Sequence, residues 1–86
     1  MAYSVLLAPP AERQLKSLAP DSQKRLVKRL KSLQNNPRPQ GVKKLAGEDE
    51  LYRIRDGNYR IIYAIRDKEL IVLVLKIGDR KEIYRS

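Results

Sequence analysis

Three arginines in one short stretch are the residues of this chain best suited to chemistry. Residues 51–63 read Leu-Tyr-Arg-Ile-Arg-Asp-Gly-Asn-Tyr-Arg-Ile-Ile-Tyr, in which apolar and polar side chains alternate on both sides of an Asp-Gly dipeptide. Asp-Gly favours a two-residue type I′ turn, and this turn would pair Arg53 with Arg60 in a β-hairpin. Because residues two apart in a strand share a face, Arg55 would join them there.

Such a cluster favours an anionic ligand. Like charges placed opposite each other destabilise a sheet, so a chain that accumulates them is expected to hold them for an anion. Nucleic acid is the polyanion that best fits a small, strongly basic protein. Two alternatives stay open. The arginines could form a solvated face without a ligand, or a three-residue turn that includes Asn58 could move Arg60 to the face opposite Arg53.

The composition narrows the chemistry further. The chain has 86 residues, which fits a single domain over residues 1–86 with one modest core. Its 19 lysines and arginines against 10 acids give a net charge of +9, which predicts a polyanionic or an acidic protein partner. The chain lacks cysteine and histidine, and therefore lacks thiolate metal ligands and the commonest general base. We expect neither metal nor cofactor, and catalysis would use Tyr, Arg, Lys or carboxylates.

No stretch of the sequence predicts a membrane segment or a secretion signal. The N-terminus has no charged leader followed by a long apolar run, and the longest apolar run, residues 70–75, is far too short to span a bilayer. The sequence therefore predicts a soluble cytoplasmic protein that does not contact a membrane.

Periodicity and chain-breaking residues predict the elements that position the arginines. A short strand at residues 3–7 precedes a helix that ends near residue 18, and Pro20 begins a second helix with an apolar and a basic face. The Asn- and Pro-rich residues 35–39 stop that helix, and residues 41–50 are expected to form a loop that carries Lys43 and Lys44. Three strands are then predicted, at residues 51–55, 58–66 and 69–77, before Gly78 releases the chain into a tail.

This order predicts an α+β fold, with an N-terminal strand, a two-helix hairpin and a three-stranded antiparallel meander in one small sheet. The last strand is apolar almost throughout, which is typical of a central strand covered on both faces. The helices are expected to cover the sheet face that carries Tyr52, Ile54, Tyr59, Ile61 and Tyr63. The arginine face would stay open, over a floor that consists of Ile62, Ala64, Ile71 and Leu73.

Two motifs carry a family resemblance. They are Gly-Asn-Tyr-Arg-Ile-Ile-Tyr at residues 57–63 and Ile-Gly-Asp-Arg-Lys-Glu-Ile-Tyr-Arg at residues 77–85, with an apolar strand between them. Together with the leucines of the second helix and Lys44-Leu45, they make nearly the whole chain resemble the toxins of the RelE/ParE superfamily, specifically its RelE branch. These toxins belong to bacterial and archaeal toxin–antitoxin systems.

The resemblance implies a fold, an activity and partners. The fold would be RelE-like, similar to the microbial ribonucleases. The activity would be that of an mRNA interferase, a metal-independent and ribosome-dependent endoribonuclease that cuts messenger RNA in the decoding site and inhibits translation. The implied partners are an acidic RelB-like antitoxin, the 70S ribosome with its mRNA, and operator DNA only through the toxin–antitoxin complex.

The resemblance also assigns roles to residues. The family's catalytic positions fall on Arg60, Arg80 and Tyr84. Arg60 would clamp the phosphate, Arg80 would stabilise the leaving oxygen, and Tyr84 would act as a base or stack on a nucleotide base. The RNA-binding residues would be Arg53, Arg55, Lys43 and Lys44.

The chain departs from the family pattern at positions that affect chemistry, and Asp79 stands where relatives often have histidine or a basic residue. Relatives often carry lysines where this chain has Arg53 and Arg55, and a guanidinium stays charged, so proton transfer by these two residues is not expected. Two other functions stay open: a ParE-like toxin that inhibits DNA gyrase without nuclease activity, and a basic nucleic-acid-binding co-repressor module.

Overall fold

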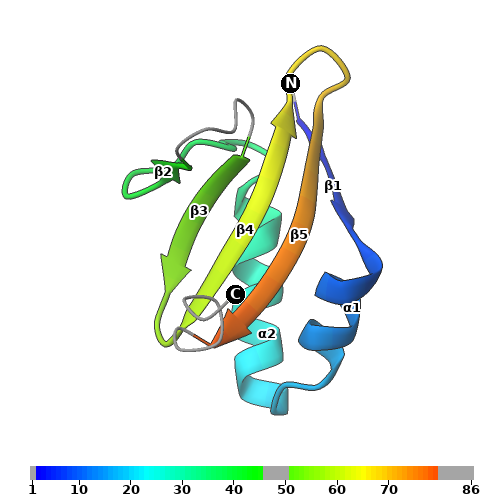
Figure 1. Ribbon diagram of the computed structural model, residues 1–86, viewed down its shortest axis with the longest axis vertical. Coiled ribbons are helices and arrows are strands. Elements are labelled where there is room, and N and C mark those ends of the chain that lie inside the picture. The colour runs from blue at the N-terminus through cyan, green and yellow to red at the C-terminus, as the bar shows by residue number, and fades with distance from the viewer. Residues whose placement is uncertain (1, 46–50, 80–86) are drawn as a thin grey trace.

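The structure, a computed structural model, describes residues 2–45 and 51–79 as two helices and a five-stranded sheet (Figure 1). In the described residues no helix is both long enough and apolar enough to cross a membrane. The strand order is β1-β5-β4-β3-β2, with β1 parallel to β5 and the other neighbours antiparallel. The elements are β1 (Ser4–Leu7), α1 (Pro9–Lys16), α2 (Pro20–Ser32), β2 (Lys43–Lys44), β3 (Leu51–Asp56), β4 (Tyr59–Arg66) and β5 (Ile71–Asp79).

The predicted α+β class and the order of elements are confirmed, with three corrections. The segment that contains Lys43 and Lys44 was predicted to be entirely loop, but these two residues form β2 and pair with β3. Strand β5 continues to Asp79, so Gly78 lies within the strand and does not end it. Helix α1 ends at Lys16, and at its C-cap the Ser17 hydroxyl donates a hydrogen bond to the carbonyl of Gln14 at 2.8 Å.

Both helices pack on one face of the sheet, and Figure 1 shows α2 behind the strands and α1 beside β5. Each begins with proline in its first turn, where the missing N–H is not needed. The predicted packing face is confirmed, because side chains of both helices and of the three long strands form one core. This core consists of Ala11, Leu15, Leu26, Leu30, Leu33, Ile54, Ile61, Tyr63, Ile65, Val72, Val74 and Ile77.

A β-bulge explains part of the apolar pattern of β5. Ile62 pairs with Lys76 whereas Tyr63 pairs with Val74, so Leu75 is an extra residue in β5. The bulge lets Val74 and Ile77 both lie in the core, although three positions separate them. The prediction that β5 is covered on both faces is wrong. The strand is central in the sheet, but on its outer face Ile71, Leu73 and Leu75 are only half-buried.

A polar network closes the end of the sheet at the β4–β5 turn. The Arg38 guanidinium donates hydrogen bonds to both carboxylate oxygens of Asp67, at 3.2 and 2.8 Å. The Tyr3 hydroxyl donates a third to Asp67 at 2.6 Å. Arg38 also lies over the Tyr52 ring, 5.3 Å from its centroid. The turn itself covers residues 67–70, which makes it longer than predicted, and Leu70 adopts a left-handed φ of 55° in it.

Candidate functional site

The β3–β4 turn differs by one residue from the predicted one. Asp56 pairs with Tyr59, so the two-residue loop is Gly57-Asn58 and not Asp56-Gly57. Gly57 has a φ of +63° while Asn58 does not have positive φ, as in a type II′ turn, which places Gly at the first loop position. The Asp56 carboxylate forms an ion pair with the guanidinium of Arg25 in α2 at 3.3 Å. This contact favours a position for Asp56 within the strand.

The arginines share one face as predicted, with different partners. Arg55 pairs with Arg60, and Arg53 pairs with Ile62, so the predicted pairing of Arg53 with Arg60 is wrong. Strand β3 is one residue longer at the turn than predicted, and β4 begins one residue later. The partner of each β3 residue therefore shifts by two positions along β4, which preserves the alternation of side chains, and the shared face is confirmed.

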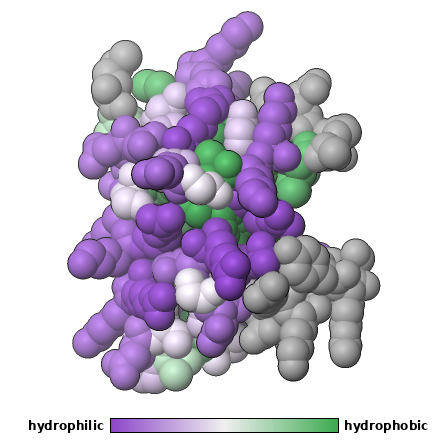
Figure 2. Space-filling view, turned by 90° about the vertical axis from the view of Figure 1, so that its left-hand side faces the viewer, coloured by the Kyte–Doolittle hydropathy of each residue, from purple (hydrophilic) through white to green (hydrophobic). Residues whose placement is uncertain are grey.

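The arginine face contains a small hollow, which we call the arginine hollow. Its volume is about 190 Å³, and its lining consists of Gly41, Lys43, Arg53, Arg55 and Arg60. Every charged residue of this lining is a cation. Seen from the β2 side of the molecule, hydrophilic side chains cover most of the surface around a small hydrophobic area (Figure 2).

Strand β2 completes the hollow. Lys43 pairs with Arg53, which places its side chain on the arginine face. Lys44 pairs with Tyr52 and therefore points to the other face of the sheet, away from the hollow. The structure thus brings Lys43 together with the arginines and leaves Lys44 apart. Their predicted roles in RNA binding stay predictions.

Arg60 is buried, with 6% of its surface exposed, whereas Arg55 is exposed and Arg53 is half-buried. The notion of an open arginine face is therefore wrong for Arg60. The reason is its position in β4, between Arg55 of β3 and Gly78 of β5. A cation that is shielded from water interacts more strongly with an anion than an exposed one does. Arg60 is thus held in place before any ligand arrives.

No carboxylate enters the arginine face from β3. Asp56 directly follows Arg55, but the alternation of the strand places it on the opposite face. There Asp56 forms the ion pair with Arg25, a contact that the sequence did not predict. A Cβ atom built on Gly57 would lie 2.6 Å from Nη2 of Arg25, so the arginine covers the turn closely. Nothing in the local sequence indicates this contact, since the two segments are distant in the chain.

Arg80 and Tyr84 lie outside the residues that the structure describes, so their catalytic roles stay predictions. Two of the described tyrosines are poor replacements for Tyr84 as a base. Burial raises the pKa of Tyr63 to about 12, and its hydroxyl donates a hydrogen bond to the carbonyl of Pro37 at 2.8 Å. The hydrogen bond to Asp67 raises the pKa of Tyr3. A base needs a shift in the opposite direction.

Residues 5–84 match the model of the family described as the ParE toxin of type II toxin–antitoxin systems. The chain is 30% identical to the putative toxin RelE1 of Methanocaldococcus jannaschii, an alignment that covers 100% of this chain and 99% of that protein. It is also 30% identical to the mRNA interferase toxin RelE of Escherichia coli K12, over 98% of this chain and 92% of that protein.

Chains in solved structures of toxin–antitoxin complexes are similar to this chain as well. A chain of the archaeal RelE–RelB complex from Pyrococcus horikoshii superposes with a TM-score of 0.82 and 32% identity, covering 93% of this chain and 97% of that one. A chain of the toxin–antitoxin complex RelBE2 from Mycobacterium tuberculosis superposes with a TM-score of 0.83 and 28% identity, covering 93% of each chain.

Proposed function

The chain belongs to the RelE/ParE superfamily of type II toxins, and we propose from this premise that it is an mRNA interferase that cuts messages on the translating ribosome. The observation that carries the proposal is the arginine hollow. It gathers the cations Lys43, Arg53, Arg55 and Arg60 of the described part of the chain around a space of about 190 Å³. That arrangement suits a phosphodiester whose negative charge increases during the reaction. The similarity to proteins named mRNA interferase supports the same activity.

The reaction that fits this site is an internal phosphoryl transfer. The 2′-oxygen of one nucleotide forms a bond to the adjacent phosphorus, the bond from phosphorus to the 5′-oxygen breaks in line, and the proton of the 2′-hydroxyl leaves as the 5′-oxygen gains one. Arg60, held within the sheet, would clamp the phosphate as its charge develops. Arg53 and Arg55 would position the backbone on either side. None of the three would transfer a proton, because a guanidinium stays charged.

Two other residues complete the step in this proposal. Tyr84 would take the proton of the 2′-hydroxyl as the base, or would position that hydroxyl. Arg80 would stabilise the leaving 5′-oxygen, which would gain its proton from water. A low intrinsic activity on free RNA follows, because the ribosome would have to hold the message in the in-line geometry. The site of action would be the cytoplasm, where translating ribosomes are found.

The regulation of this activity would depend on an antitoxin. The RelE structures similar to this chain include complexes with the antitoxin RelB. With a net charge of +9, this chain would bind an acidic antitoxin, which would cover the arginine face and keep the toxin inactive. Operator DNA would be bound only by the complex of the two proteins.

The decisive experiment is primer-extension mapping of one message, free and bound to translating ribosomes, after incubation with the purified protein. We expect cuts within the ribosome-bound message and none in the free message. Equal cutting of both, or of neither, contradicts the proposal. The match to the ParE toxin family favours a second candidate, inhibition of DNA gyrase, and a supercoiling assay with the same preparation tests it.

A further inference from the structure

A polar side chain of α1 lies on the side of the helix that is otherwise apolar. Ala11 and Leu15 of α1 are buried in the core, and Gln14, three residues after one and next to the other, is half-buried. The side-chain oxygen of Gln14, Oε1, accepts a hydrogen bond from the backbone N–H of Ile77 in β5 at 2.8 Å. A glutamine of the first helix therefore holds the backbone of the last strand.

The contact stands where β5 has lost its neighbouring strand. Strand β1 ends at Leu7, which pairs with Val74, and the N–H of Ala8 then donates to the carbonyl of Val74 at 2.8 Å. From residue 75 to Asp79, β5 has no neighbouring strand on this side among the described residues. A half-buried N–H without an acceptor would destabilise this edge. Gln14 supplies the acceptor that β1 does not reach to provide.

The β-bulge makes a second attachment of β5 useful. The bulge at Leu75 lies between the part of β5 that pairs with β1 and the part that contains Ile77. A bulge disrupts the ladder locally and bends the strand, so β1 does not fix the direction of the second part. Gln14 attaches this second part to α1, two residues after the bulge.

The end of β5 that Gln14 holds is the part that faces Arg60. Ile77 pairs with Ile61 in β4, and the next residue, Gly78, pairs with Arg60. Paired residues of neighbouring strands share a face, so Gly78 lies beside Arg60 on the arginine face. Gly78 carries no side chain, and the β5 backbone itself therefore bounds Arg60 on that side. A displacement of this strand end would change the surroundings of Arg60 directly.

We propose that Gln14 is a positioning residue of the arginine hollow: its amide oxygen holds the end of β5 against α1, and this strand end fixes Arg60 for the phosphate. Helix α1 packs on the face of the sheet opposite the hollow, so Gln14 acts through Arg60 and does not contact RNA. This proposal rests on the proposed function, because the clamping of a phosphate by Arg60 belongs to that function.

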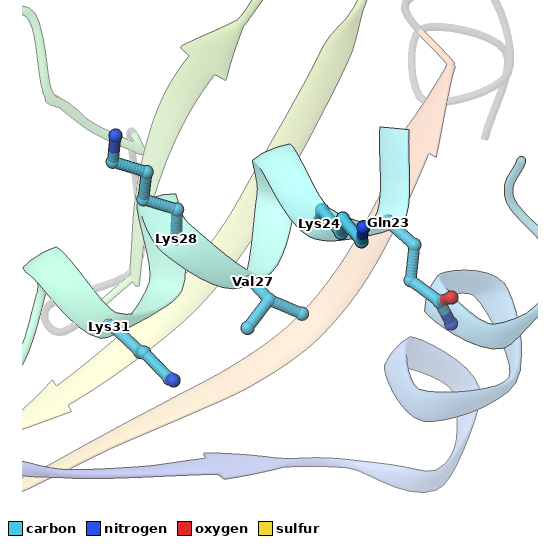
Figure 3. Close-up of a pocket in the computed structure, with 5 residues that line it drawn as sticks. All are labelled: Gln23, Lys24, Val27, Lys28 and Lys31. Carbon is cyan, nitrogen blue, oxygen red and sulfur yellow. The ribbon is translucent and has the colours of Figure 1, made fainter. Parts of the chain in front are cut away.

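The test compares two substitutions of glutamine by methionine. Gln14→Met keeps an unbranched side chain of similar helix propensity, and it replaces the accepting amide by a thioether, which is a weak acceptor. The matched control is Gln23→Met in α2. Gln23 points toward α1 (Figure 3), where its Nε2 donates a hydrogen bond to the carbonyl of Leu15 at 3.3 Å. Each variant loses one glutamine hydrogen bond to α1 or from it, and Gln14→Met alone removes the contact with β5.

A third variant, Gln14→Glu, tests the acceptor itself. A carboxylate keeps an oxygen where the amide oxygen was, and glutamate has a helix propensity close to that of glutamine. Gln14→Glu should therefore restore the hydrogen bond to Ile77 and resemble the wild type in each measurement.

The first measurement is the single-turnover cleavage rate on saturating ribosomes that carry a message, at a temperature at which every variant is folded. Gln14→Met should cleave about tenfold more slowly than the wild type, because a small displacement of a group that binds the reacting phosphate lowers the rate strongly. Its affinity for ribosomes should stay at the wild-type value. Both methionine variants should melt a few degrees below the wild type, but Gln23→Met should cleave at the wild-type rate.

The second measurement needs no message. In nitrogen–proton NMR spectra of the purified chain, the Nε–H resonance of Arg60 can be assigned by its absence from the spectrum of Arg60→Lys. This resonance should move in Gln14→Met and stay in place in Gln23→Met and in Gln14→Glu. The amide of Ile77 should also exchange with deuterium faster in Gln14→Met, because it has lost its acceptor.

An Arg60 resonance that does not move in Gln14→Met overturns the proposal, and so does a cleavage rate of this variant equal to that of an active wild-type chain. If Gln14→Glu resembles Gln14→Met, or if Gln23→Met is equally slow, the acceptor for Ile77 is not the cause and the proposal is wrong. If the Arg60 resonance moves as expected but the wild-type chain cleaves no message, the positioning of Arg60 by Gln14 is supported and the proposed nuclease function fails.

Discussion

The arginines at the two ends of the sheet have opposite electrostatic surroundings. At the end with the β4–β5 turn, Arg38 gives two hydrogen bonds to Asp67, donates a third to the Tyr52 hydroxyl at 3.3 Å and lies over the Tyr52 ring. At the end with the β3–β4 turn, Arg55 and Arg60 lie directly opposite each other on neighbouring strands. The first end pairs its arginine with an acid, whereas on the arginine face of the other end like charges lie opposite each other.

This difference indicates what each end contributes. The hydrogen bonds of Asp67 raise the pKa of Arg38, and those of Arg38 lower the pKa of Asp67 to about 2, so each group stabilises the charged form of the other. The network joins Tyr3, which directly precedes β1, to the segment after α2, to β3 and to the β4–β5 turn, and it needs no ligand. Among the described residues, every charged side chain that lines the arginine hollow is a cation, so an anionic ligand would meet opposite charge there. We expect substitutions at the first end to change stability and those at the second to change activity.

The largest expected effect is the loss of cleavage in Arg60→Ala. Removing one donor that stabilises developing charge typically lowers the rate of the chemical step by ~10²–10³. The measurement is the single-turnover rate on saturating ribosomes that carry a message. Arg60→Lys keeps the charge and lacks the forked geometry, so it should recover only part of the rate.

Arg38→Ala is the matched control for Arg60→Ala, because it removes an arginine at the opposite end of the sheet. Its cleavage rate should equal that of the wild type. Since Arg60 is buried, thermal unfolding of Arg60→Ala must show that the variant is folded at the assay temperature. A folded Arg60→Ala that cleaves at the wild-type rate would show that the phosphate clamp lies elsewhere.

The features that were predicted correctly from the sequence depend on the regular spacing of side chains along a strand or a helix. The shared face of Arg53, Arg55 and Arg60 follows from the alternation of side chains in a strand. The predicted turn was displaced by one residue, which shifts the pairing register of the two strands by two residues, and the face therefore stayed the same. The helix faces were likewise predictable, because leucines recur at helical spacing in α2 and only one side of it is apolar.

Features that depend on tertiary structure could not be read from the sequence. The burial of Arg60 follows from the position of β4 in the middle of the sheet. Strand β2 has two residues, too few for any periodic signal, and it exists because β3 offers it a partner. The sequence does not reveal the bulge at Leu75, because apolar residues occupy both faces of β5 there and the alternation shows no break. Arg80 and Tyr84 lie outside the described residues, so the predictions for them still await a test.

The second prediction concerns Gly57, which connects the arginine strands. Gly57→Ala should lower the free energy of unfolding by about 1–2 kcal/mol, the usual cost of a left-handed conformation for a residue with a side chain. The new Cβ would also meet Nη2 of Arg25, but that group ends a flexible side chain and can move away. Chemical denaturation measures the loss.

Variants of Arg25 show whether the lost stability comes from backbone strain at Gly57 or from the contact with the guanidinium. If strain at Gly57 dominates, Gly57→Ala should cost the same in wild-type and Arg25→Ala backgrounds. A cost that disappears in the Arg25→Ala background would assign it to the contact with the guanidinium. In both cases Gly57→Ala changes the turn that connects the strands of Arg55 and Arg60, so the cleavage rate should fall together with the stability.

The third prediction concerns stability at the opposite end. Arg38→Ala should lower the melting temperature by a few degrees, because it removes a two-point contact to Asp67 and the stacking on Tyr52, while exposed ion pairs contribute little each. Arg38→Lys should recover part of the loss, since a lysine keeps the charge but cannot form the fork. An unchanged melting temperature in Arg38→Ala would mean that the network does not stabilise the fold.

The smallest expected effect is a difference in acid stability that arises from Asp67. Hydrogen bonds from Arg38 and Tyr3 hold the pKa of Asp67 at about 2 in the folded chain, below the value of about 3.9 expected when unfolded. A depressed folded pKa means that the stabilisation is fully present above the unfolded pKa and is lost as pH falls toward 2. Asp67→Asn should therefore melt below the wild type at pH 7, and the two melting temperatures should converge between pH 5 and pH 2. Glu12→Gln serves as the control, because Lys16 lowers the pKa of Glu12 in an exposed helix pair that lies apart from the network. A constant offset between wild type and Asp67→Asn across this range would show that the ionised carboxylate is not what joins this end of the sheet.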